Sequence, residues 1–215
     1  MNNDNKIVID LFGSPGTGKS TISAYFKEKY NLHDIKDWYI NKFFGKIYLR
    51  LFLKLYKCNK VLRQKEADIK KILGSYDEYK NIISPETNIS LFIKYMLFDY
   101  YLELKNRKNA IIDEGIIHNC LILMVEYNLP LEKVEKIYKT LKIDNIEYLG
   151  IYLDTESCYK NIKKRNRKRC YLDFLDDNSL KEILNKWDIA VKEVSKIFKL
   201  YTYEELIEYI EKKVK

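Results

Sequence analysis

The sequence predicts an α/β fold in which a parallel sheet is covered by helices on both faces. Three apolar runs have the length of buried strands and are separated by stretches with helical spacing: residues 6–12, 110–113 and 148–154. Strands that alternate with helices favour a parallel sheet. Only 7 glycines and 3 prolines occur in 215 residues, so few breaks interrupt the predicted helices. A chain of this length fits a single domain with a full core.

The first half of the chain predicts two strands and a series of helices. The run Lys6–Phe12 is a strand, and a glycine-rich loop and a helix over Lys19–Tyr30 follow it. The short apolar piece Leu32–Ile35 predicts a second strand. Residues 38–75 carry apolar positions at helical spacing. Ser84-Pro85-Glu86-Thr87 then starts a helix that runs to about residue 105, because proline fits the first helical turn.

The second half repeats the alternation. Its predicted strands are 110–113, 148–154 and a short last one at 198–201. Its predicted helices are 116–127, 131–141 and 176–198, and a further helix begins after strand 148–154, with Asp154 or Thr155 as its N-cap. Thr202-Tyr203-Glu204-Glu205 is a capping box that opens a terminal helix.

The loop Gly13-Ser14-Pro15-Gly16-Thr17-Gly18-Lys19-Ser20 matches G-x-x-x-x-G-K-[ST] completely. Glycines let such a loop fold into a nest of backbone N–H groups, and the helix after it directs its positive end at the same anion. Lys19 is placed to reach the β- and γ-phosphates, and Ser20 to ligate magnesium. The motif predicts binding of a nucleoside triphosphate with Mg²⁺, and the cofactor expected is ATP, with GTP left open. The predicted binding residues are Gly13, Ser14, Gly16, Thr17, Gly18, Lys19, Ser20 and Thr21.

A second acidic site is predicted where the strand Ala110–Asp113 ends. The carboxyl ends of parallel strands meet at one edge of the sheet, so Asp113 is expected close to the glycine loop, as a magnesium ligand. Glu114 follows directly and has three open interpretations. It could orient a water for hydrolysis, bind a substrate hydroxyl or face solvent.

A basic stretch runs from Lys160 to Arg169, with seven basic residues and no acidic one. It comes one helix after the strand 148–154 and therefore returns to the edge of the phosphate site. Arginines on a closing segment can stabilise the charge that develops in phosphoryl transfer. Arg165 and Arg169 are the candidates. A solvated helix end or a nucleic-acid patch is the alternative.

Together these motifs resemble the nucleoside-monophosphate-kinase-like kinases, above all the thymidylate kinase and adenylate kinase groups. The matching segments are Gly13–Thr21, Ile112–Gly115, Ile151–Asp154, Arg165–Arg169 and Asp176-Asp177. The resemblance implies a three-layer fold with a five-stranded sheet in the order 2-3-1-4-5. It also implies an acceptor-binding insertion at 38–83 and a lid at 165–177, with Lys19 and the lid arginines stabilising the transferred phosphate. The D-R-[YHF] triplet of thymidylate kinases is missing, since Asp113-Glu114-Gly115 occupies its place.

The acceptor half of the site has only candidates. Asp37 lies where related kinases of small hydroxylated substrates place a base, with an exposed turn aspartate as the alternative. His118 is expected either to face the acceptor or to have a structural role. Several aromatic residues could stack on a nucleobase or belong to the core: Phe43, Phe44, Tyr95, Phe98, Tyr100 and Tyr101. The apolar stretch Ile47–Tyr56 indicates a homodimer interface or packing under the acceptor-binding cover.

Composition limits the class of protein. The formal charge of +8 permits a nucleic-acid partner, but lysines interleave with glutamates as on solvated helix faces. No apolar run is long enough to span a membrane, and no leader pattern opens the chain, so a cytoplasmic protein is expected. Four scattered cysteines favour neither zinc nor a disulfide framework.

The sequence therefore predicts an ATP-dependent phosphotransferase that acts on a small metabolite, with a nucleotide or nucleoside among the acceptors considered. Two alternatives remain open at this stage. One is an NTP-hydrolysing switch, which Asp113-Glu114 would suit. The other is a kinase of nucleic-acid ends, which only the charge favours.

Overall fold

The computed structural model describes residues 6–35, 43–74, 79, 88–106, 108–165 and 170–215 of the chain. The predictions for Asp37 and Arg169 fall outside these residues.

A four-stranded parallel sheet forms the middle of the described structure. Its order is β2-β1-β3-β4, with β1 at Val8–Gly13, β2 at Ala110–Ile112, β3 at Glu147–Ile151 and β4 at Leu200–Tyr201. Every residue of β1 is buried, as expected of a strand with a neighbour on each side and helices over both faces. The apolar runs in the sequence therefore predicted the central strands.

The prediction of a five-stranded sheet is wrong for the described residues. Instead of a second strand, the segment after the first helix makes a single parallel bridge, at His33, to Ala110 of β2. The N–H of His33 donates to the carbonyl of Asn109 (2.9 Å), and the N–H of Ile111 donates to that of His33 (3.0 Å). Beside the bridge, the side chain of Asp34 pairs with Lys27 at 3.3 Å, and the described residues of this segment make no further strand pairing with β2. The bridge nevertheless lies beside β2, the place that the order 2-3-1-4-5 gives the missing strand.

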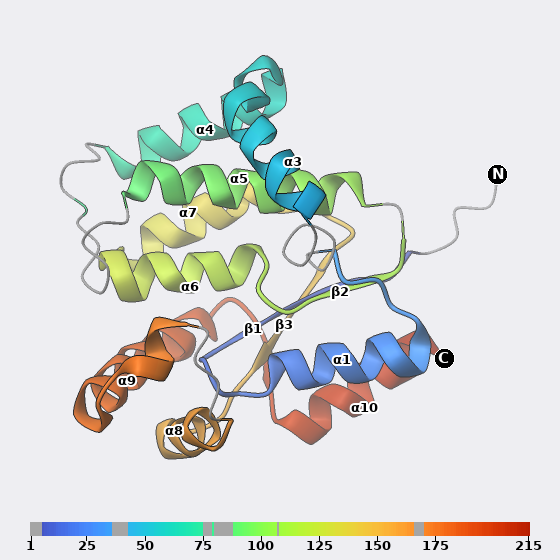
Figure 1. Ribbon diagram of the computed structural model, residues 1–215, viewed down its shortest axis with the longest axis vertical. Coiled ribbons are helices and arrows are strands. Elements are labelled where there is room, and N and C mark those ends of the chain that lie inside the picture. Colours follow the sequence, from blue (N-terminus) through green and yellow to red (C-terminus); the bar gives the residue numbers. More distant parts are fainter. Residues whose placement is uncertain (1–5, 36–42, 75–78, 80–87, 107, 166–169) are drawn as a thin grey trace.

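Helices cover both faces of the sheet (Figure 1). Along β1, Ile9 and Leu11 face α1 (Lys19–Tyr30) and α10 (Tyr203–Val214) and share an apolar cluster with them. Val8 and Phe12 point the other way, as the two-residue period of a strand requires. Phe12 packs there with α6 (Ile116–Tyr127) and α9 (Asp177–Val194).

A thick helical layer lies on that second face, beyond β1 and β2. It contains α3 (Phe43–Leu55), a 3-10 turn (Tyr56–Cys58), α4 (Lys60–Leu73), α5 (Ile89–Lys105), α6 and α7 (Leu131–Leu141). Its core includes Phe98 and Tyr100, which are 1% and 6% exposed. Of the two roles considered for these aromatic residues, Phe98 and Tyr100 therefore have the one in the hydrophobic core. Tyr95 on the same helix is 39% exposed.

Helix α3 has an apolar face directed to solvent. Ile47, Leu51 and Leu55 follow one another at four-residue spacing and are 39%, 49% and 58% exposed, whereas Phe52 is buried against Phe98. The subunit interface expected at Ile47–Tyr56 stays a prediction, and so does the acceptor-binding role of residues 38–83.

The C-terminal helices begin where their capping signals predict. Asp154 accepts a hydrogen bond from the N–H of Ser157 at the start of α8 (Thr155–Lys164), and Asp176 does the same for Asn178 and Ser179 at the start of α9. Thr202 forms the expected capping box with Glu205. No helix in the described part of the chain is long and apolar enough to cross a membrane, and the cytoplasmic location stays a prediction.

We predict that Gly150→Ala destabilises the fold, because a methyl group there would lie 2.3 Å from a methyl carbon of Leu200 and 2.6 Å from the ring of Phe12. Overpacking of this kind costs about 1–3 kcal/mol of unfolding free energy, which urea denaturation measures. Adding Leu200→Ala should recover part of the loss, because it removes the nearer contact. An unchanged denaturation midpoint in the single variant would contradict this packing.

Candidate functional site

The glycine loop at residues 13–20, which the sequence predicts to be a phosphate-binding loop, connects β1 to α1, and its shape depends on glycines. Gly13 and Gly16 have φ angles of 149° and 88°, which L side chains rarely adopt. Space is also restricted, because a Cβ on Gly13 would lie 2.4 Å from the carbonyl oxygen of Ile151, and one on Gly16 2.6 Å from that of Cys158. The loop therefore packs directly against β3 and α8.

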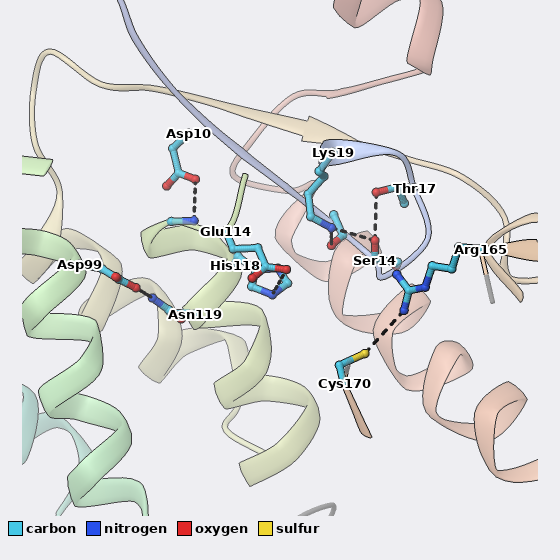
Figure 2. Close-up of polar contacts among 12 residues, drawn as sticks. Asp10, Ser14, Thr17, Lys19, Asp99, Glu114, His118, Asn119, Arg165 and Cys170 are labelled. Carbon is cyan, nitrogen blue, oxygen red and sulfur yellow. Dashed lines mark hydrogen bonds and ion pairs between the residues drawn. The ribbon is translucent and has the colours of Figure 1, made fainter. Parts of the chain in front are cut away.

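Lys19 is buried at the start of α1, with 6% of its surface exposed. Its ammonium group donates to the carbonyl oxygens of Gly13 (2.9 Å) and Ser14 (3.0 Å), as Figure 2 shows. Burial lowers the pKa of Lys19, whereas the nearby carboxylates of Glu114 and Asp113 raise it. The cation thus lies inside the loop, within electrostatic reach of both predicted acidic residues.

The other loop residues divide into two groups. Ser14 and Thr17 are buried, and the hydroxyl of Thr17 donates to the carbonyl of Ser14 at 2.9 Å. Thr17 therefore stabilises the loop by an internal bond. Ser20 and Thr21 are exposed in the first turn of α1. The hydroxyl of Ser20 is thus accessible to a ligand of the loop.

The loop opens into a cleft of about 980 Å³. The cleft is lined by the loop, α6, the end of α8, the residues after the basic stretch, α9 and the start of α10. The lining residues outside the loop include Glu114, His118, Ile122, Glu126, Asn161, Lys164, Arg165, Cys170, Tyr171, Leu172, Trp187 and Tyr203. The structure therefore brings Lys19, Glu114 and Arg165 to one cavity, although they lie far apart in the sequence.

The turn Asp113–Gly115 follows β2 and leads into α6. Asp113 is half-buried, and the side chain of Glu114 is 58% exposed. Against this turn packs Asp10 of β1, which is completely buried and accepts a hydrogen bond from the N–H of Gly115 at 3.2 Å. Sequence reasoning missed Asp10, although an aspartate inside the apolar run 6–12 is an unusual residue that could have drawn attention to it.

His118 extends the acidic side of the cleft by one helical turn. Its Nε2 lies 4.0 Å from Oε1 of Glu114, and its ring stacks on Trp187 with centroids 5.2 Å apart. Behind it, away from the cleft, Asn119 donates to Asp99 of α5 at 2.8 Å, and both residues are buried (Figure 2). Neither the His118–Trp187 stack nor the Asp99–Asn119 pair was predicted, because each joins separate helices.

Arg165 lies at the end of α8 and contacts Asp173, which follows the basic stretch in the sequence. Its guanidinium donates to Oδ1 of Asp173 from Nη2 (2.6 Å) and Nε (3.1 Å), and Asp173 also accepts the N–H of Cys170. The carboxylate of Asp173 is buried, so this ion pair is protected from solvent. Arg165 lines the cleft and also lowers the pKa of Lys19. The lid role of residues 165–177 stays a prediction.

Helix α8 is tied to the phosphate-binding loop as well. The side-chain amide of Asn161 donates to the carbonyl of Gly16 at 2.8 Å, over a separation of 145 residues. The bond fixes one peptide group of the loop against α8. Asn161 was also missed, because nothing in the local sequence marks it.

A search of the sequence against protein-family models and curated proteins finds no match. Among solved structures, deoxyadenosine kinase from M. mycoides with bound dATP aligns over 97% of this chain and 98% of that chain, with 20% identity and a TM-score of 0.53. The same kinase with bound dCTP aligns over the same shares, with 19% identity and a TM-score of 0.50. The chain has the fold of these kinases. The kinase-like fold expected from the motifs is thus confirmed.

We predict that Gly16→Ala lowers the affinity for ATP by about tenfold or more, because the new methyl group must displace the loop from α8. Gly74→Ala is the matched control. Gly74 also has a positive φ (79°), but nothing lies within 4 Å of its Cβ position. Titration with a fluorescent ATP analogue measures both. Equal affinities for Gly16→Ala and the wild type would contradict the assignment of the loop.

Proposed function

We propose that this chain is a kinase that transfers the γ-phosphate of ATP to a hydroxyl group of a nucleoside, with deoxynucleosides as the first acceptors to test. The observation that carries the proposal is the convergence of Lys19, Glu114 and Arg165 on one cleft beside the phosphate-binding loop. The aligned solved structures are deoxyadenosine kinases with bound dATP or dCTP. Their acceptor class is the one that we propose for this chain.

The donor half of the mechanism follows from the loop. Lys19 has two carbonyl partners, and a bound triphosphate would offer it anionic oxygens instead. Because Lys19 is 6% exposed, this charge would stabilise the oxygens of the transferred group more strongly than it would in water.

Magnesium fits the residues of the site. The described residues contain no group of three His, Cys, Asp or Glu side chains that would form a complete metal cage. Mg²⁺ does not need one, because it keeps several waters and binds phosphate oxygens together with one or two protein groups. We propose Ser20 and Asp113 as those groups. When bound, the ion would neutralise charge on the phosphates.

The acceptor half of the mechanism requires a base near the γ-phosphate. The acceptor hydroxyl oxygen forms a bond to the γ-phosphorus, the bond from that phosphorus to the β-γ bridging oxygen breaks, and ADP leaves. The hydroxyl proton passes to a carboxylate, for which we propose Glu114, since it lines the cleft. Arg165 would add positive charge from the opposite wall.

The positive charge of the chain supports a small acceptor rather than a nucleic acid. Many lysines pair with carboxylates one helical turn away, for example Lys136 with Glu132 at 2.5 Å and Lys186 with Glu182 at 3.0 Å. Among the described residues, charge that is paired in this way favours a small acceptor over a polyanion, which requires a continuous basic surface.

We expect the purified chain with ATP and Mg²⁺ to convert at least one deoxynucleoside to its monophosphate, with one ADP released per product. Mass spectrometry of the products across nucleosides, deoxynucleosides and nucleoside monophosphates identifies the acceptor. Equal ADP release with and without every acceptor would instead indicate an NTP hydrolase. Stimulation by oligonucleotides that falls steeply with salt would indicate a nucleic-acid substrate.

We further expect Lys19→Ala and Asp113→Asn to lower kcat/KM by at least about a hundredfold, because each removes charge stabilisation at the transferred phosphate. Ser195→Ala, at the end of α9 and outside the cleft lining, serves as the control and should keep wild-type activity. Activity within twofold of wild type in Lys19→Ala would refute the donor site.

A further inference from the structure

Asp10 is an acidic residue in the middle of the most buried strand. It is 0% exposed, and its neighbours along β1 are Ile9 and Leu11. Its side chain points to the same face as Val8 and Phe12, toward the layer that contains α6. Burying a carboxylate in such surroundings is costly unless hydrogen bonds and dipoles compensate. The compensation comes from a different part of the chain.

The carboxylate of Asp10 lies at the N-terminus of α6. Its two oxygens accept hydrogen bonds from the N–H of Gly115 (3.2 Å) and, at the limit of bonding distance, of Ile117 (3.5 Å). Gly115 is the N-cap residue and makes no side-chain cap of its own. Asp10 therefore satisfies backbone groups that a local serine or aspartate would usually cap, and its charge matches the positive end of the helix.

Gly115 is fitted to this carboxylate. A Cβ on Gly115 would lie 2.5 Å from the Cγ and both oxygens of Asp10. The φ of Gly115 is −90°, outside the left-handed region that favours glycine. Close approach of the carboxylate is therefore one reason for a glycine at this position.

Two functional loops thus depend on one strand. Asp10 is three residues before Gly13, the first glycine of the phosphate-binding loop, and its side chain holds the residue that follows Asp113 and Glu114. Figure 2 shows the bond from Asp10 to that turn, and Lys19 at the far end of the loop that continues the same strand. The strand β1 is paired on both sides and cannot shift without breaking the sheet.

We propose that Asp10 is a positioning residue, which sets Asp113 and Glu114 relative to the phosphate-binding loop. Asp10 itself touches no substrate. This inference rests on the proposed function, because it assigns the two acidic residues of the turn to magnesium and to the acceptor hydroxyl. Small misplacement of such groups lowers the rate strongly, whereas triphosphate binding by the loop is affected little.

The first test is Asp10→Asn, which keeps the shape but replaces one acceptor oxygen by a donor amide. We expect kcat to fall about tenfold to a hundredfold with the KM for ATP within about twofold of wild type. The magnesium concentration for half-maximal rate should rise. The affinity for a fluorescent ATP analogue, measured once with magnesium and once with EDTA, gives a readout independent of turnover. The difference between these two affinities should be smaller in the variant than in the wild type.

The second test is a double-mutant cycle between Asp10 and Gly115. Gly115→Ala should lower kcat at least about tenfold in the wild-type background, because the methyl group displaces the turn from the carboxylate. In the Asp10→Ala background the same substitution should cost less than about twofold, since the atoms it would meet are gone. Equal costs in both backgrounds would overturn the proposed contact.

Leu121→Ala controls for loss of stability. Leu121 is completely buried one turn further along α6 and packs with Phe12, away from the turn. Melting temperatures identify conditions where all variants are folded. If Asp10→Asn then shows wild-type kcat and wild-type magnesium dependence, or if Leu121→Ala reproduces its changes, Asp10 has only a structural role.

The outcome also separates this inference from the proposed function. If the wild-type chain phosphorylates no nucleoside, the proposed function fails. The effect of magnesium on nucleotide binding still tests Asp10 in that case. If the wild type is an active kinase and Asp10→Asn matches it in rate and magnesium dependence, only the positioning role fails.

Discussion

The burial of β1 between two parallel neighbours is the constraint on which the site depends. Hydrogen bonds to β2 on one side and β3 on the other fix where the strand ends, and both partners end at the same edge of the sheet. The glycine loop continues β1, and the turn Asp113–Gly115 continues β2. A residue of one loop can therefore face a residue of the other across a short distance, although about a hundred positions separate them in sequence.

The charges in this region are compatible with the multiply charged anion that the motif predicts as ligand. Lys19 is buried deeply enough that burial lowers its pKa, and two carboxylates oppose that effect. A cation in this position has lost much of its hydration before a ligand arrives, so a phosphate needs to displace only backbone carbonyls. The acidic residues become favourable neighbours of the phosphates once a divalent cation lies between them, which is the physical reason for expecting magnesium here.

Local patterns in the sequence predicted most helices and strands, but they did not predict the contacts between residues far apart in the chain. The helices at 19–30, 116–127 and 131–141 have the bounds that apolar spacing and Asn or Pro breaks indicated. The second strand was expected from the four residues Leu32–Ile35. Whether so short a segment forms a strand depends on the strand beside it, and within this segment only His33 pairs with β2. Asp10, Asn161 and the His118–Trp187 stack act between elements that lie far apart in the chain, so no window of sequence contains both partners.

The basic stretch in the sequence marked Arg165 as a candidate site residue, but it did not predict which residue Arg165 contacts. The basic stretch predicted an arginine aimed at phosphate, whereas the structure pairs Arg165 with the buried carboxylate of Asp173. Arg165 also lies close enough to the phosphate-binding loop to lower the pKa of Lys19. Asp173 holds the guanidinium in place, as a preorganised donor requires, and joins the end of α8 to the 3-10 turn at Tyr171–Phe174. Since Asn161 of the same helix holds the glycine loop, α8 connects that loop to the segment that the sequence predicts to be a lid.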